Sequence, residues 1–249
     1  MLGTRLAALL LLSSVAFAET LPAGTVVPIM LSTGLNARKG DADKKIEGSV
    51  MQDVPLPTGG KINVRSRVFG HVVSVTKPDS TKSGASGASI VLKFDIIEDH
   101  GRTIKLTAAL LAVASMESVA DAQAPIENNS DLDPISQWVT RQVGGDVVNR
   151  GRGKVASNTG IVGTWVEGSW VTGKLTPNPE AGCPSGSGYD QPQALWLFSS
   201  AACGTYGFPN VKIGNAGRTP PLGEIELKSD RNITIRGGSG WLLISVAGE

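Results

Sequence analysis

Alternation of apolar and polar residues is clearest in the middle of the chain. Between residues 90 and 96, Ile, Leu and Phe side chains occupy every second position, and apolar side chains do the same between residues 104 and 110. The segment Glu98–Gly101, which contains Asp and Gly, separates the two stretches. A period of two on both sides of such a turn predicts an antiparallel β-hairpin.

Shorter apolar runs predict further strands along the rest of the chain. Pro28 lies inside the first run and has no N–H to donate, so we expect that strand at a sheet edge or a bulge. Residues 224–228 alternate cleanly, as in a half-exposed antiparallel strand. The other predicted strands cover residues 26–31, 46–51, 62–75, 163–171, 194–199, 211–213, 232–236 and 241–246.

One short helix is predicted after a polar connector at residues 116–133. Asp133 is a suitable N-cap, and Pro134 suits the first helical position. Apolar residues then recur with helical spacing up to Gln142, and Gly144 and its glycine neighbour end the pattern. We therefore expect this helix inside an otherwise β-rich chain.

Composition supports a mainly β fold. The chain has 249 residues, 31 of them Gly, and only 18% are charged, which suits many short strands joined by tight turns. If the strand near 231–247 closes a sheet begun at 24–75, then residues 116–222 are an insertion. We expect residues 19–249 to form a single elaborated antiparallel β-barrel or sandwich with one short helix and a long insertion.

Residues 1–18 read as a cleavable signal peptide. Arg5 precedes an apolar run, and Ala16 and Ala18 supply the small residues that signal peptidase requires. The run is shorter than the roughly 20 residues that span a bilayer, although an uncleaved anchor is the alternative. We expect a periplasmic or secreted protein without a transmembrane anchor after signal cleavage.

The two cysteines, Cys183 and Cys203, are expected to form one disulfide, because exported proteins mature in an oxidising compartment. A metal pair or a catalytic thiol is the alternative. A zinc site needs about four N or S ligands, and the chain offers only His71 and His100 besides. We therefore expect neither a metal site nor a cofactor.

Charge and motifs exclude several other functions. The formal net charge of +1 leaves no basic footprint for nucleic acid. Residues 168–174 have the spacing of a phosphate loop, but the hydroxyl residue after the lysine is missing. Ser74–Lys77 matches Ser-x-x-Lys without its partner motifs. His71 could join Asp53 and a serine, but a histidine on a half-exposed strand face is the simpler interpretation. We assign no catalytic residue.

Five tryptophans lie in the second half of the chain. We expect Trp196 and Trp241 in the core. Trp165 and Trp170 are candidate contacts for a ligand or partner, because exposed aromatic side chains stack on sugar rings and anchor protein interfaces. Core packing is the alternative for this pair.

Three segments carry a family resemblance: residues 21–31 (LPAGTVVPIML), 48–54 (GSVMQDV) and 232–238 (NITIRGG). Together they resemble the periplasmic β-barrel of the TrbI-type conjugal-transfer proteins, which are scaffolds of type IV secretion channels. The match is good over residues 21–75 and looser over 231–247. It implies the fold more than the role, because those scaffolds carry a membrane anchor where this chain carries a signal.

Together these observations favour an exported non-enzymatic β domain that acts in envelope assembly or protein–protein interaction. Its partners would be envelope proteins or further copies of itself. Binding of cell-wall glycan or polysaccharide through the Trp-rich insertion is the alternative, and a hydrolase of envelope polymer is a third possibility.

Overall fold

The structure is a computed structural model of the 249-residue chain. For residues 139–141, 147–149, 154–157, 160–166 and 170–172 it describes the backbone alone. The described residues are 19–79, 87–124, 139–144, 147–149, 154–157, 160–166, 170–173, 183, 193–218, 220 and 223–247.

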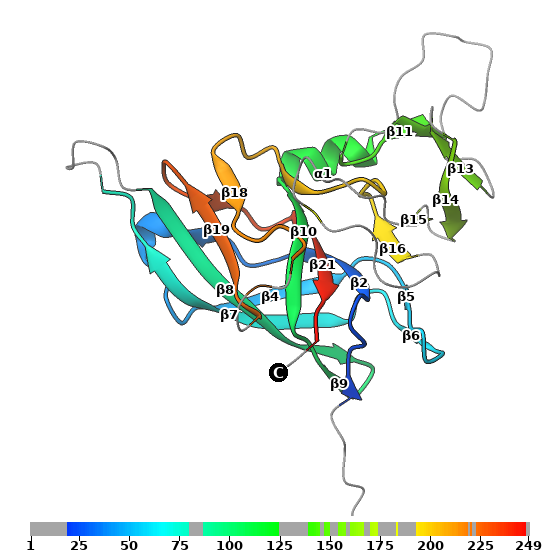
Figure 1. The fold of residues 1–249 in the computed structure, drawn as a ribbon, viewed down its shortest axis with the longest axis horizontal. Helices are drawn as coiled ribbons and strands as arrows, with labels where there is room; N and C mark the ends of the chain where they lie inside the picture. Colours follow the sequence, from blue (N-terminus) through cyan, green and yellow to red (C-terminus); the bar gives the residue numbers. More distant parts are fainter. Residues whose placement is uncertain are drawn as a thin grey trace, which may run out of the picture.

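An eleven-stranded mixed sheet forms most of the molecule (Figure 1). Its main path runs β1-β9-β8-β7-β4-β2-β21-β10-β17, and β19, which carries β18 on its far edge, pairs with the first half of β8. The pairs β1–β9 and β10–β17 are parallel, and the others are antiparallel. Its strands are β1 (Glu19–Thr20), β2 (Val26–Leu31), β4 (Lys45–Val50), β7 (Arg67–Thr76), β8 (Ala88–Asp99), β9 (Arg102–Lys105), β10 (Ala108–Ala114), β17 (Gly204–Tyr206), β18 (Val211–Ile213), β19 (Ile225–Ser229) and β21 (Ser239–Ser245).

The predicted mainly β fold is confirmed, and of the two expected architectures the sandwich-like one fits. Within the described part of the chain, the end strands β1, β17 and β18 form no ladder with one another, so the sheet is not closed into a barrel. Smaller sheets accompany it. They comprise β3 (Leu35–Asn36) with β20 (Thr234–Ile235), β5 (Val54–Pro55) with β6 (Lys61–Ile62), β11 (Val139–Arg141) with β12 (Val147–Asn149), and β13 (Lys154–Ser157), β14 (Gly160–Val166), β15 (Trp170–Gly173) and β16 (Gln193–Trp196).

The predicted hairpin is confirmed as β8 and β9. Asp99 pairs with Arg102, and the turn residues His100 and Gly101 have φ angles of 48° and 83°. Two successive positive φ angles are typical of the tight hairpin turn that matches the twist of the strands. The apolar series that continues to residue 110 belongs to two strands, because β9 ends at Lys105 and β10 begins three residues later.

Three neighbouring strands, β2, β21 and β10, are buried on both faces. One apolar cluster fills the space under β4, β7 and β8, and a second lies on the opposite face, under α1 (Met116–Gln123) and β16. Strands covered on both sides need apolar residues at consecutive positions, which explains the uninterrupted runs of β10 and β21. Trp241 lies in the first cluster, 6.0 Å from the ring of Phe94, and Trp196 in the second.

Pro28 lies inside the sheet and not at its edge. β2 pairs with β21 along its whole length, whereas β4 pairs only with Ile29–Leu31. The ladder to β4 therefore begins just after the proline, where a missing N–H leaves no bond unmade. Two residues earlier, the N–H of Val26 donates to the side chain of Gln193 at 3.2 Å.

The helix differs from the predicted one. Residues 116–123, expected to be a connector, form α1, and the N-cap Ser115 accepts a 3.1 Å hydrogen bond from the N–H of Ser118. Only Val119 and Ala122 of this helix are buried, so the apolar periodicity is too short to stand out. In the segment where a helix was expected, residues 133–138 lie outside the described residues, and Val139–Arg141 form strand β11, so the prediction is wrong there.

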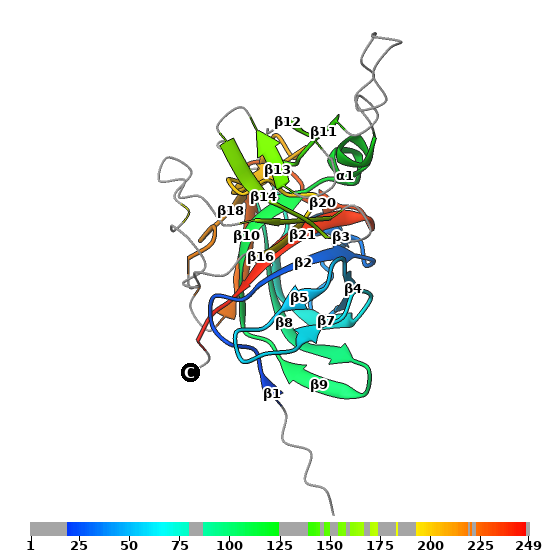
Figure 2. The ribbon, with the colours of Figure 1, turned by 90° about the vertical axis from the view of Figure 1, so that its right-hand side faces the viewer.

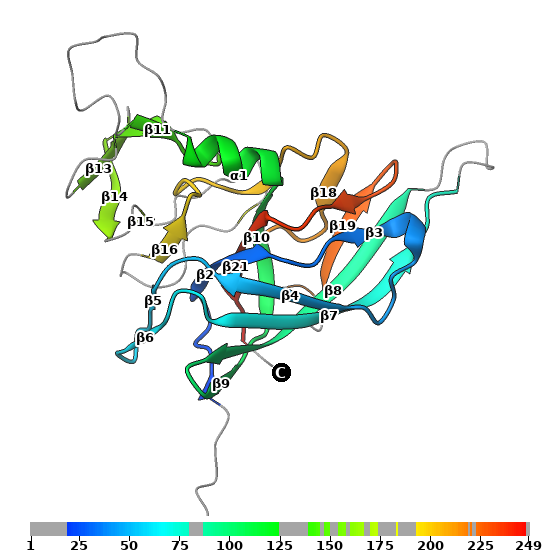
Figure 3. The same cartoon turned by 180° about the vertical axis from the view of Figure 1, so that it is seen from behind.

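The helix and strands between residues 116 and 222, which were expected to form an insertion, lie partly at one end of the molecule and partly in the large sheet. In the views of Figure 2 and Figure 3, α1 and β11–β14 lie together at the end of the molecule away from β9. The strands β17 and β18 instead belong to the large sheet, where β17 lies beside β10. This return of the chain places β17 beside β10, opposite α1, and a pocket lies between α1 and β17.

Candidate functional site

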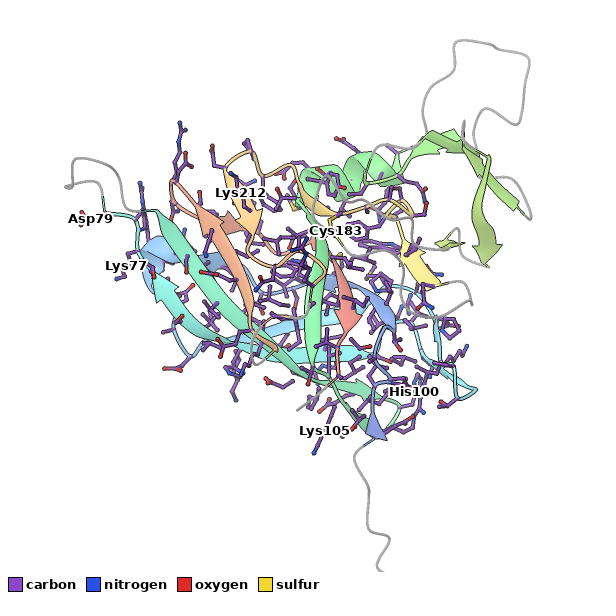
Figure 4. The ribbon with its side chains drawn as sticks, in the orientation of Figure 1. Lys77, Asp79, His100, Lys105, Cys183 and Lys212 are labelled. Carbon is purple, nitrogen blue, oxygen red and sulfur yellow. A yellow bond between two sulfur atoms is a disulfide. The ribbon has the colours of Figure 1, made fainter. Side chains whose placement is uncertain are left out.

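A disulfide joins Cys183 and Cys203, as predicted, with 6.2 Å between their Cα atoms. Both cysteines are buried, and Sγ of Cys183 lies 3.9 Å from the carbonyl oxygen of Leu111 in β10 (Figure 4). Next to the disulfide, Oη of Tyr206 accepts from the N–H of Cys203 at 2.9 Å and donates to its carbonyl oxygen at 3.0 Å. The disulfide and these bonds fix the chain at the start of β17.

A pocket of about 390 Å³ lies between α1, residues 142–144 and β17. These three segments are far apart in sequence, and the parallel pairing of β10 with β17 helps to bring them together. A carboxylate, hydroxyl groups, an amide and one aromatic ring line the pocket. The lining residues are Ser118, Asp121, Ala122, Gln142, Val143, Gly144, Thr205, Tyr206 and Gly207.

Gln142 is held rigidly in this wall. It is 2% exposed, and its Nε2 donates to the carbonyl oxygen of Phe198 at 3.2 Å. The next residue, Val143, exchanges backbone hydrogen bonds of 2.9 Å and 2.8 Å with Leu197 and Ser199. Within the described part of the protein, Oε1 of Gln142 has no hydrogen-bond donor. A buried acceptor without a donor is unusual in native proteins.

Two glycines bring backbone close to hydroxyl groups at this pocket. Gly207 has φ of 73°, and a Cβ there would lie 2.3 Å from Oγ of Ser115 and 2.7 Å from Oγ of Ser118. Gly144 has φ of 107°, and its Cβ would lie 2.5 Å from Oγ of Ser199. Both positions require glycine in backbone conformation and in space.

Asp99 is the centre of a second polar group, at the β8–β9 turn. Its side chain is fully buried, and Oδ1 accepts from Oγ of Ser66 at 2.7 Å and from Nδ2 of Asn63 at 2.9 Å. Arg102 donates to Oδ2, and Nδ1 of His100 lies 3.0 Å from Oδ1. Figure 4 shows His100 at the tip of this hairpin.

These contacts make Asp99 a structural anion. Burial alone raises the pKa of a carboxyl group, but the hydrogen bonds from His100, Asn63, Ser66 and Arg102 outweigh it and hold the pKa of Asp99 well below its ordinary value of 3.8. An ionised carboxylate with its acceptor sites filled ties the hairpin to residues 63–66. It has no proton to donate at neutral pH.

A catalytic set of His71, Asp53 and a serine was one possibility from the sequence, but the structure does not bring His71 and Asp53 together. Nδ1 of His71, on β7, lies 2.8 Å from Asp95 of β8 on the open face of the sheet. Asp53 instead binds Nζ of Lys61 at 2.6 Å and the N–H of Val64 at 2.8 Å. Burial raises the pKa of Asp53, but the hydrogen bonds from Lys61 and Val64 lower it overall.

The other motifs from the sequence lie on strands where the structure describes them. Ser74 lies within strand β7, as the pattern predicted, and not at the start of a helix. Of residues 168–174, only 170–173 are described, and they form β15. Among the residues that the structure describes, no three His, Cys, Asp or Glu side chains gather as a metal site would require.

Of the four tryptophans assigned a place from the sequence, the structure describes the side chains of two. Trp196 and Trp241 are 0% exposed, which confirms them as core residues. Trp165 and Trp170 belong to β14 and β15, where the register pairs Trp165 with Val171 and Trp170 with Val166. The side chains of this candidate pair lie outside the described part.

Sequence reasoning did not find the pocket residues. Ser118 and Asp121 lie in the segment that was expected to be a connector, and Tyr206 lies next to the disulfide without a motif of its own. The only local signal was Ser115, a residue type common at helix N-caps.

Comparisons of the chain with models of known protein families, with curated proteins and with solved structures found no match. None of the helices in the described residues is long and apolar enough to cross a membrane.

Proposed function

We propose that this chain is an exported, non-enzymatic β domain of the bacterial cell envelope that assembles through protein–protein contacts, in a role similar to that of the TrbI-type scaffolds. The Cys183–Cys203 disulfide supports an oxidising compartment. Residues 1–18 would be removed as a signal peptide, which leaves a periplasmic or secreted protein.

The observation that carries this proposal is a mixed apolar and charged surface on the open face of β4, β7 and β8. The guanidinium of Arg67 lies 4.5 Å from the centre of the Phe69 ring. Phe69 is half-buried and pairs with the half-buried Ile96 on β8. Arginine and aromatic side chains are enriched among the residues that dominate binding energy at protein interfaces.

Charges surround this aromatic centre in a mixed pattern. Arg67 lies 3.6 Å from Glu47 and 3.7 Å from Glu98, and all three side chains are about half exposed. Exposed ion pairs add little to folding, typically less than about 1 kcal/mol, so they can exchange partners with little loss. Both signs are present on one face: Lys45, Arg67 and Lys93 are positive, and Glu47, Asp95 and Glu98 are negative.

A second copy of the chain is the partner that this pattern fits. A face carrying both signs can be complementary to itself when two copies meet around a two-fold axis. Phe69 and Ile96 would then form the apolar centre, with the charged side chains as the rim.

Site-specific photo-crosslinking in cells tests the proposal. A photo-reactive amino acid at position 69 should give crosslinked multimers of the chain, whereas the same group at Lys212, an exposed position on β18, should not. Crosslinks from position 69 to a different envelope protein would replace self-assembly with a heteromeric contact. Monomer alone from both positions would contradict the proposed function.

A further inference from the structure

We propose that the pocket between α1 and β17 binds a neutral polyhydroxylated ligand, a pyranose unit of a glycan. This inference does not depend on the assembly face, because the pocket is lined by α1, residues 142–144 and β17, whereas the assembly face lies on β4, β7 and β8. The sequence had suggested glycan binding at Trp165 and Trp170, whose side chains lie outside the described residues.

Size and lining suit a small ligand. A volume of about 390 Å³ falls in the range of small-molecule sites, which combine apolar walls with a few polar groups that orient the ligand. Ala122 and Val143 provide apolar wall, and Ser118, Asp121 and Gln142 provide the polar groups.

Asp121 is the most accessible polar group of this wall. It lies one helical turn after Ser118 on α1 and is exposed. Among the described residues, its carboxylate forms neither an ion pair nor a hydrogen bond. A carboxylate beside a hydroxyl can accept hydrogen bonds from two neighbouring hydroxyl groups of a sugar, and hydrogen bonds to charged groups are stronger than neutral ones.

Tyr206 supplies an aromatic surface at the pocket. Its hydroxyl group is bound on both sides by the backbone of Cys203, which is itself fixed by the disulfide, so the ring is held in place before any ligand arrives. A fixed aromatic ring loses little entropy on binding. It offers an apolar face to the C–H side of a sugar ring.

The charge of the lining distinguishes between classes of ligand. Among the described residues that line the pocket none is Lys, Arg or His, and Asp121 is negative, so this described lining offers no cation to a phosphate or a carboxylate. Oε1 of Gln142, in the same wall, is a buried acceptor that lacks a donor within the described residues. A ligand rich in hydroxyl donors matches a wall of acceptors.

Binding by the whole mature chain can be measured by calorimetry or by saturation-transfer NMR, with the N-acetylglucosamine trimer and cellotriose as probes. Spermidine serves as a cationic probe and inorganic phosphate as an anionic one. The blocking variant is Asp121→Trp, at an exposed position where a large side chain enters the pocket without disturbing the core. The matched control is Glu117→Trp, on the same helix but outside the lining residues.

We expect millimolar or tighter binding of at least one trisaccharide, abolished by Asp121→Trp and unchanged by Glu117→Trp. Asp121→Ala, which removes the carboxylate without filling space, should weaken binding about tenfold or more. Binding that Asp121→Trp leaves intact, or no binding of either sugar by a folded protein, would overturn the proposal. Binding of spermidine or phosphate without either sugar would overturn the ligand class. None of these results affects the crosslinking at position 69, so the two proposals fail separately.

Discussion

Oε1 of Gln52 accepts a 2.7 Å hydrogen bond from the backbone N–H of Trp196, and both residues are fully buried. The bond joins the segment after β4 to the end of β16, 144 residues later in the chain. Trp196 has φ of 50°, a left-handed conformation that costs a non-glycine residue roughly 1–2 kcal/mol. The side chain of Gln52 therefore helps to hold a strained turn in which the Trp196 ring enters the second apolar cluster.

Replacing Gln52 with leucine should destabilise the protein by about 1–3 kcal/mol, because it removes the acceptor of a buried N–H. Urea unfolding followed by tryptophan fluorescence measures the change. Gln123→Leu makes the same substitution at an exposed position near the end of α1 and serves as the control. Equal unfolding midpoints for the two variants would show that this bond contributes nothing.

The anionic state of Asp99 predicts a specific dependence of stability on pH. Its pKa is lower in the folded protein than in the unfolded chain, so its stabilising effect is complete above the unfolded value of about 3.9 and is lost as the pH falls toward the folded value. Asp99→Asn should therefore lower stability by roughly 2 kcal/mol at pH 7. The difference between variant and parent should shrink below a pH of about 4.

Urea unfolding at neutral and acid pH measures this difference. Asp230→Asn, at an exposed carboxylate, is the control and should leave stability nearly unchanged at both pH values. A gap between Asp99→Asn and the parent protein that stays constant down to pH 2 would contradict the assigned role of the carboxylate.

Reduction of the Cys183–Cys203 disulfide should destabilise the protein by about 3 kcal/mol, because a bond between residues 20 apart restricts the unfolded chain. Thermal unfolding with and without reductant measures the loss. A double Cys183→Ser, Cys203→Ser variant should match the reduced protein and should not respond to reductant. If reductant lowers the midpoint of that variant too, the effect has another origin.

The sequence predicted correctly those structural features that depend on interactions between residues close together in the chain. The β8–β9 hairpin could be predicted because its alternation and its turn residues lie in one continuous segment, Ala88–Lys105, and the burial of Trp241 because this residue lies in an apolar strand. These two features depend on neighbours in sequence, so one chain is enough to infer them. Two-sided burial of β10 was not predicted, because residues 104–110 were interpreted as one alternating strand, although Ala108–Ala114 contains no polar residue.

Helix α1, the pocket and the position of Pro28 depend on contacts between distant segments, so no local sequence pattern predicted them. Helix α1 has a buried face of only two residues, so its stability comes from the cap at Ser115 and from packing on β21 and β10. The pocket exists because the chain returns beside β10 as β17 after ninety residues, in a parallel pair that no local signal announces. Pro28 was expected at a sheet edge or a bulge, because the sequence does not show that the ladder to β4 covers only Ile29–Leu31.

Alanine substitutions at two glycines near the pocket can distinguish the cost of backbone strain from the cost of steric collision. Gly204 and Gly207 have φ angles of 86° and 73°, so an alanine at either position should cost roughly 1–2 kcal/mol through its left-handed backbone. A Cβ at Gly204 would meet no atom within 4 Å, whereas a Cβ at Gly207 would collide with Oγ of Ser115 and Ser118.

Gly207→Ala should therefore destabilise the protein by about 1 kcal/mol more than Gly204→Ala, since the collision displaces the N-cap of α1 and caps of this kind contribute about that amount. Urea unfolding of the two variants gives the comparison directly. Because α1 also forms one wall of the pocket, Gly207→Ala should weaken binding of the trisaccharide probes, while Gly204→Ala should leave it unchanged. Equal stability of the two variants would mean that α1 moves aside without loss and that its position beside β17 is not fixed by this contact.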